Sequence, residues 1–99
     1  MSRIKEFTPN AWQDYMWFFE NDKRGLKRIN KLIDNIDSAD PFSGLGKPEP
    51  LRYGLGGWWS RQINHEDRLV YKVTEKRISI LACKYHYGDA AEHTDDFDN

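Results

Sequence analysis

The chain has 99 residues, of which 38% are hydrophobic and 14% aromatic, and its formal net charge is −1. This length allows a single domain with one thin hydrophobic core. No apolar run approaches the ~20 residues that a membrane-spanning helix needs, so we expect neither a membrane segment nor a secretory signal. The single cysteine excludes an intramolecular disulfide, and a cytoplasmic location is the default for such a chain.

Charge is divided unevenly along the chain. Residues 88–99 carry five acidic residues and no Lys or Arg, whereas the first 87 residues hold all 15 basic residues and 11 acidic ones, a net of +4. We therefore expect one mildly basic domain over residues 1–87. We expect residues 88–99 to be a disordered acidic tail, because they contain too few apolar side chains to form a core. A basic domain suits a polyanionic partner, but a charge of this size also serves simply to solvate a surface.

The N-terminal half predicts a short strand followed by two helices. Residues 2–7 alternate weakly and indicate the strand. Thr8-Pro9 is typical of a helix start, and aromatic residues follow it at helical spacing. A second helix is predicted from Lys23, because apolar residues recur at steps of three and four as far as Ile36. Its other faces carry basic residues that suit either nucleic-acid docking or solvation, and the sequence leaves both open.

The second half predicts a loop and then a sheet. Residues 38–50 hold three prolines and two glycines, which is typical of an ordered surface loop. Strands are predicted at residues 51–55, 58–63, 68–74 and 77–87, joined by short turns, with the last strand central because both of its faces are apolar. The predicted class is α+β, with two N-terminal helices packed on one face of a twisted antiparallel β-sheet. The other face is then available for a ligand.

Several side chains in this half have the chemistry of an acid–base site. Glu49 lies between two prolines that restrict its backbone to extended conformations, and it can act as a general base. His86 is the residue type best suited to proton transfer near neutral pH. Arg68 opens a predicted strand, where a guanidinium can stabilise a pentavalent phosphorane. Arg52 and Arg61 are weaker candidates for the same task.

Each candidate also has a structural explanation. Taken singly, Glu49 and His86 are more often exposed or structural, and Arg68 can pair with a neighbouring carboxylate. Tyr87 can stack on a base or contact a phosphate, or it can pack in the core. Cys83 is more often a small core residue than a nucleophile. The sequence contains no metal-ligand spacing and no glycine-rich phosphate loop, so we expect neither a metal nor a cofactor.

These residue types suit the cleavage of RNA. RNA supplies its own nucleophile, the 2′-hydroxyl, so the enzyme needs a base for that hydroxyl, an acid for the leaving 5′-oxygen and positive charge for the phosphorane. Glu49, His86 and the arginines match these needs. Their spacing does not show that they meet in space.

Four strings, in this order along the chain, resemble the YoeB/Txe family of toxins from type II toxin–antitoxin systems, within the RelE-like superfamily. They are GKPEPL (46–51), GWWSR (57–61), HEDRLVY (65–71) and ACKYHY (82–87). The likeness extends from about residue 4 to residue 87. It implies a RelE-like, microbial-RNase-like fold and an endoribonuclease that cuts mRNA in the ribosomal A site. It also implies neutralisation by a YefM-type antitoxin, and many members form homodimers.

The resemblance also assigns roles to individual residues. Glu49 resembles the general base, His86 the general acid and Arg68 the transition-state stabiliser, and Tyr87 resembles the residue that contacts or positions the substrate. Substrate binding is implied for two further basic positions, Arg52 and Arg61.

The sequence departs from the family pattern at two places. Gln62 stands where relatives often have a second basic residue, and twelve residues follow Tyr87, where the family usually ends. An acidic tail that lay in a basic groove would compete with RNA. An alternative function is therefore a catalytically impaired, toxin-like module that binds an antitoxin or RNA.

Overall fold

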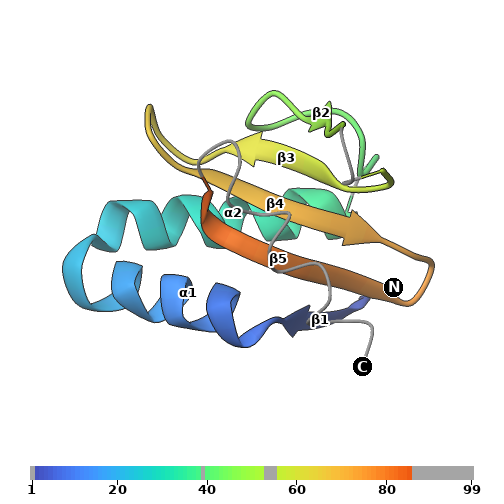
Figure 1. Ribbon diagram of the computed structural model, residues 1–99. Coiled ribbons are helices and arrows are strands. Elements are labelled where there is room, and N and C mark those ends of the chain that lie inside the picture. The colour runs from blue at the N-terminus through green and yellow to red at the C-terminus, as the bar shows by residue number, and fades with distance from the viewer. Residues whose placement is uncertain (1, 39, 53–55, 86–99) are drawn as a thin grey trace.

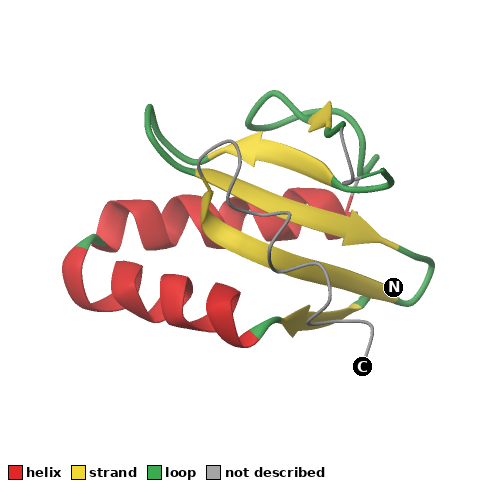
Figure 2. Ribbon diagram, in the orientation of Figure 1, coloured by secondary structure: helices red, strands yellow, loops and turns green. Residues whose placement is uncertain are grey.

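The computed structural model describes residues 2–38, 40–52 and 56–85. Its elements, shown in Figure 1, are β1 (Ile4–Phe7), α1 (Pro9–Asn21), α2 (Lys23–Ser38), β2 (Glu49–Pro50), β3 (Trp59–Gln62), β4 (Arg68–Val73) and β5 (Arg77–Tyr85). The strands form one sheet in the order β1-β5-β4-β3-β2, and both helices pack on one face of it (Figures 1 and 2). The predicted α+β class with two N-terminal helices is confirmed. The predicted tail, residues 88–99, lies outside the described residues.

The sheet is mixed, whereas the prediction was antiparallel throughout. β1 pairs in parallel with β5, placing Ile4 opposite Arg77, while the other three pairs are antiparallel. A parallel pair needs a long connection, and the two helices, the loop and three strands supply it here. The alternation of a four-residue strand does not encode the direction of its partner, so the sequence pattern missed this pairing.

The edge strand β2 lies earlier in the chain than predicted. It consists of Glu49 and Pro50 and pairs with Ser60 and Trp59 of β3. The prediction had assigned these two residues to the loop and had placed the strand at residues 51–55. Proline lacks an N–H group and is tolerated on an edge strand, where one side needs no donor. Residues 53–55 lie outside the described residues.

The main core lies between the helices and the sheet. Thr8 begins α1 as predicted: its Oγ1 accepts a hydrogen bond from the Ala11 amide at 2.9 Å and donates one to the Leu81 carbonyl at 3.0 Å. The predicted apolar face of α2 is buried. Gly25 permits a close approach of the helices, because a Cβ there would lie 2.5 Å from Cδ1 of Phe18. Further along, α2 contributes Ile29, Leu32, Ile33 and Ile36 to this core.

Charged contacts tie the end of α2 to β1. The carboxylate of Asp37 accepts hydrogen bonds from the Arg3 amide at 3.0 Å and from Nζ of Lys5 at 2.8 Å. The guanidinium of Arg3 lies 3.5 Å from the same carboxylate. The hydrogen bond from Lys5, followed by that from the Arg3 amide, holds the pKa of Asp37 below its ordinary value of 3.8.

These contacts predict an acid-sensitive contribution to folding. The folded-state pKa of Asp37 lies below the unfolded value, so its contribution is complete above about pH 4 and is lost as the pH falls through the folded-state pKa. Asp37→Asn should remove this component. The measurement is the unfolding free energy of wild type and of Asp37→Asn, obtained by chemical denaturation at about pH 6 and at about pH 3. The loss of unfolding free energy between the two pH values should be smaller in the variant. Asp34→Asn, on an exposed position of the same helix, is the matched control, and equal acid responses of wild type and Asp37→Asn would contradict the prediction.

Candidate active site

Two of the predicted catalytic residues meet on the sheet face opposite the helices. Nη2 of Arg68, the first residue of β4, lies 3.2 Å from Oε1 of Glu49 in β2. Nε of the same arginine donates to Oγ of Ser60 at 2.9 Å, and Ser60 stands directly opposite Glu49 in the β2–β3 ladder. The structure thus brings together the predicted general base and the predicted transition-state cation, which are 19 positions apart in the sequence.

The two partners differ in exposure. The side chain of Glu49 is 45% exposed, that of Arg68 is 19% exposed, and Ser60 is fully buried. Ser60 therefore fixes one edge of the guanidinium from inside, while the carboxylate remains open to an incoming molecule. An accessible carboxylate beside an oriented cation suits proton abstraction next to a developing negative charge.

A small apolar cluster lies on the same sheet face. It comprises Leu51, Trp58, Val70, Leu81 and Ala82. Trp58 is 7% exposed, so most of its ring is used for packing. Trp59 points to the opposite side, where it packs against the main core and lies 4.7 Å from Phe42 between ring centroids. Packing against apolar neighbours therefore accounts for both tryptophans.

The end of β5 reaches the same region. Tyr85 pairs with Arg68 in the β4–β5 ladder, and irregular register precedes this pair. Oδ2 of Asp14 in α1 accepts hydrogen bonds from the Cys83 amide at 3.1 Å and the Lys84 amide at 3.2 Å. Bulges of this kind are common beside active sites, where they redirect a strand. No sequence motif pointed to Asp14 as part of this region. Its contact with the end of β5 depends on how α1 packs against the sheet.

The predicted acid and the predicted substrate tyrosine cannot be placed. His86 and Tyr87 follow Tyr85 directly in the chain but lie outside the described residues. Arg52 is exposed and is the second residue after β2. Its prediction as a substrate-binding residue stays a prediction.

Arg61 lies in the core and not on the site face. It is fully buried, and its guanidinium contacts α2, β4 and the loop before β2. Neighbouring residues of a strand face opposite sides, so Arg61 points toward the helices while Ser60 points toward the site. Period-2 alternation along residues 58–63 places Arg61 on the same face as Trp59 and Ile63, and this pattern is the sequence signal that Arg61 belongs to the core.

The described residues also bear on metal binding and on the thiol of Cys83. In the described ranges, no group of three or more His, Cys, Asp or Glu side chains could hold a metal ion. Cys83 is buried, as expected for a small core residue, and burial raises the pKa of its thiol far above the usual range. The helices of the described part of the chain include none that is long and apolar enough to cross a membrane.

Comparison with known proteins identifies the family of this chain. A family model described as YoeB-like toxin of bacterial type II toxin–antitoxin system matches residues 7–87. Toxin YoeB of Synechocystis sp. is 54% identical over 81 residues, which cover 82% of this chain and 93% of that protein.

Solved structures show the same fold. The YoeB dimer from Staphylococcus aureus has a TM-score of 0.84 and 47% identity, covering 88% of this chain and all of that chain. A heterotetrameric YoeB–YefM complex from the same organism has a TM-score of 0.80, again at 47% identity and with the same coverage. The chain belongs to the YoeB-like toxins of bacterial type II toxin–antitoxin systems.

Proposed function

We propose that this toxin is an endoribonuclease that cleaves mRNA in the ribosomal A site by general acid–base catalysis. The observation that carries the proposal is the 3.2 Å contact between Glu49 and Arg68, with Ser60 orienting the guanidinium. The family assignment agrees with a toxin, and the pair supplies two of the three groups that cleavage of RNA requires.

In the proposed reaction, Glu49 accepts the proton of the 2′-hydroxyl as the 2′-oxygen attacks the phosphorus. Arg68 balances the negative charge that develops on the phosphorane. The bond from phosphorus to the 5′-oxygen then breaks, and His86 donates a proton to that oxygen. The products are a 2′,3′-cyclic phosphate and a 5′-hydroxyl. Side chains meet each need, so the proposed reaction uses no metal ion.

The roles proposed for His86, Tyr87 and Arg52 depend on where the chain places them relative to the Glu49–Arg68 pair. Tyr85 pairs with Arg68, so the chain leaves β5 beside the proposed phosphate site. This register supports roles for His86 as the acid and Tyr87 as a substrate contact. Arg52, exposed and close after β2, is proposed to bind the RNA backbone.

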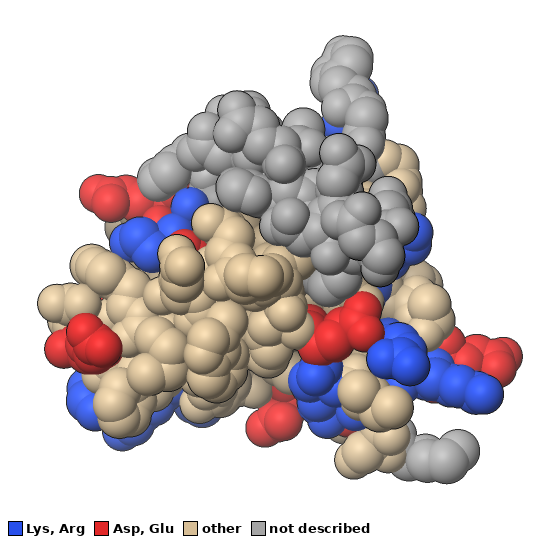
Figure 3. All heavy atoms as spheres, turned by 60° about the horizontal axis from the view of Figure 1, so that its bottom comes forward, with Lys and Arg blue, Asp and Glu red and all other residues tan. Residues whose placement is uncertain are grey.

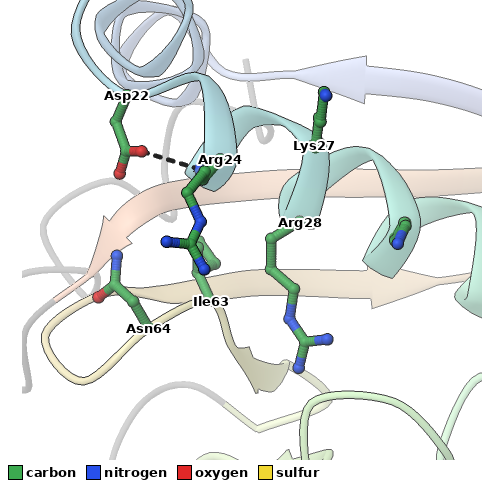
Figure 4. A pocket seen from close by; sticks show the side chains of 8 residues that line it. Asp22, Arg24, Lys27, Arg28, Ile63 and Asn64 are labelled. Carbon is green, nitrogen blue, oxygen red and sulfur yellow. Dashed lines mark hydrogen bonds between the residues drawn. The ribbon is translucent and has the colours of Figure 1, made fainter.

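The basic groove on α2 supports a second contact with ribosomal RNA. Arg24, Lys27, Arg28 and Lys31 line it together with Asp22, Ile63 and Asn64 (Figure 4). Arg24 and Arg28 project from α2 to the side where Ile63 and Asn64 lie. Within the described residues, none of the four basic side chains forms an ion pair, and like charges four positions apart disfavour a helix slightly. A phosphate backbone would relieve this repulsion, so we propose ribosomal RNA as the occupant.

Protein partners complete the proposal. The S. aureus relatives were solved as a dimer and in a complex with YefM, and we propose a homodimer and a YefM-type antitoxin for this chain. Figure 3 shows a broad face over α1 with few charged side chains, and Trp12, Trp17 and Phe19 are all more than 40% exposed. Such a face suits a contact with protein. We propose that an antitoxin segment folds over the Glu49–Arg68 region and that the toxin acts in the cytoplasm, where ribosomes translate.

The acid–base pair predicts the effect of single substitutions. Glu49→Gln removes the base but keeps the shape of the side chain, and it should slow cleavage by about 10²-fold or more. Arg68→Ala should cause a loss of similar size, because the phosphorane then lacks its cation. The measurement is single-turnover cleavage of mRNA placed in the A site of purified ribosomes.

Glu66→Gln, in the exposed β3–β4 turn, is the matched control and should cleave at the wild-type rate. Wild-type cleavage by Glu49→Gln would exclude Glu49 as the base. A wild-type protein that binds an antitoxin and ribosomes but leaves the mRNA intact would favour the alternative, a toxin-like binding module.

The α2 groove predicts a salt-dependent effect on ribosome binding. Arg24→Glu and Arg28→Glu should each weaken binding, and each should lower the slope of log affinity against log salt by about one phosphate contact. Cosedimentation with ribosomes over a salt series measures both quantities. Lys76→Glu reverses one exposed charge in the β4–β5 turn and is the control. An equal effect of all three substitutions would show that only net charge matters.

A further inference from the structure

Arg61 is the largest fully buried side chain in the described part of the protein. Its guanidinium donates to four backbone carbonyls of one loop, those of Leu45 at 2.9 Å, Ser43 at 2.9 Å, Pro41 at 3.1 Å and Asp40 at 3.5 Å. It thereby closes the loop that leads into β2 and Glu49. These contacts require the five N–H donors of a planar guanidinium. The ammonium group of a lysine has only three N–H donors and cannot form all of these hydrogen bonds.

Two further side chains complete the network around the guanidinium. Tyr71 in β4 accepts a hydrogen bond from Nε of Arg61 at 3.1 Å and donates its own to the Pro41 carbonyl at 2.6 Å. Burial raises the pKa of Tyr71, which keeps this hydroxyl protonated and able to donate. Oδ1 of Asn35 accepts from Nη1 of Arg61 at 2.5 Å and from the Leu45 amide at 3.2 Å. The loop is therefore bound to α2 and β4 through one buried cation.

The path from this network to Glu49 is short and stiff. Gly44, Gly46 and Lys47 have φ values of 104°, 81° and 52°, which turn the chain back toward β3. The Gly46 carbonyl accepts the Gln62 amide at 2.7 Å. A Cβ at Gly46 would lie 2.7 Å from Cδ2 of Leu32, so the loop fits closely over the core. Pro48 then restricts the backbone immediately before Glu49.

β2 has little means of holding Glu49 unaided. It is a two-residue strand at the edge of the sheet, and the prolines at 48 and 50 donate no hydrogen bonds. If the loop moved away, the buried guanidinium would lose four carbonyl acceptors, and an uncompensated buried charge is costly. The free-energy cost of leaving the buried Arg61 guanidinium without acceptors therefore keeps the loop in contact with the sheet.

We infer that Arg61 is a positioning residue, which holds Glu49 against Arg68 by locking residues 41–46 to the sheet. The inference rests on the proposed function, because it assumes that Glu49 takes part in cleavage. It replaces direct substrate binding as the role of Arg61. A purely structural role would lower stability without a specific effect on the step that uses Glu49.

Substitutions that remove hydrogen bonds between Arg61 and the loop should slow the cleavage step. Arg61→Met keeps much of the side-chain volume and removes all the donors, and it should lower the single-turnover cleavage rate at saturating ribosomes by about 10–100-fold, as expected for a small displacement of a reacting group. Ribosome affinity should remain within about twofold of wild type. Tyr71→Phe removes only the hydroxyl and should lower the rate about threefold to tenfold. Circular dichroism and thermal melting identify the variants that remain folded at the assay temperature.

A double-mutant cycle separates positioning from stability. If Arg61 acts through Glu49, the double variant Arg61→Met, Glu49→Gln should cleave no more slowly than Glu49→Gln alone. Ile78→Val, a buried change in β5 away from the loop, is the control for lost stability and should keep the wild-type rate. Multiplying effects in the double variant would overturn the inference.

The remaining outcomes are also distinct. Wild-type cleavage by Tyr71→Phe or by a folded Arg61→Met protein, together with loss in Glu49→Gln, would overturn the inference and leave the proposed function in place. Wild-type cleavage by Glu49→Gln would instead overturn the proposed function. If Arg61→Met does not fold, Tyr71→Phe decides the question, because it leaves the guanidinium and the aromatic ring in the core.

Discussion

The burial of one guanidinium constrains more of this structure than any other interaction. A cation removed from water requires hydrogen-bond acceptors on every side, and Arg61 finds most of its acceptors in the backbone carbonyls of a single loop. The loop consequently follows the sheet although it contains no regular secondary structure as far as β2. Tyr71 and Asn35 are needed for the same reason, because they satisfy the remaining donors. The position of the edge strand β2 is therefore tied to the charge in the core.

The candidate site is assembled from segments that are held by different sets of contacts. Arg68 lies on β4, an interior strand with a neighbour on each side. Glu49 is held from the side of the loop, whereas the end of β5 is held from α1. There, Asp14 binds two consecutive amides, and Nζ of Lys84 lies 3.5 Å from the ring centroid of Trp17. A change in α1 should thus disturb the end of β5 without moving Glu49, and a change in the loop should do the reverse.

The sequence predicted those features that depend on local patterns. The 3.6-residue period located both helices, Thr8-Pro9 marked the start of α1, and alternation assigned Arg61 and Ser60 to opposite faces. The parallel β1–β5 pair and the early position of β2 depend on contacts across the sheet, which no local pattern contains. Arg61 shows the difference most clearly. Its charge suggested a substrate contact, and only the arrangement of the loop carbonyls around it explains why a charged residue occupies a core position.

The exposure of Glu49 bears on how the Glu49–Arg68 pair can react. An ion pair whose carboxylate is about half exposed contributes only about 0–1 kcal/mol, so in the proposed reaction an incoming phosphate can displace the carboxylate from the guanidinium at small cost. The hydrogen bond from Nε of Arg68 to Ser60 does not involve the terminal nitrogens, so it can keep Arg68 oriented while those nitrogens exchange partners. In the proposed reaction, the displaced carboxylate is then free to accept the proton of a 2′-hydroxyl beside that phosphate. A buried pair would resist this exchange, and a fully exposed pair would lack the orientation that Ser60 provides.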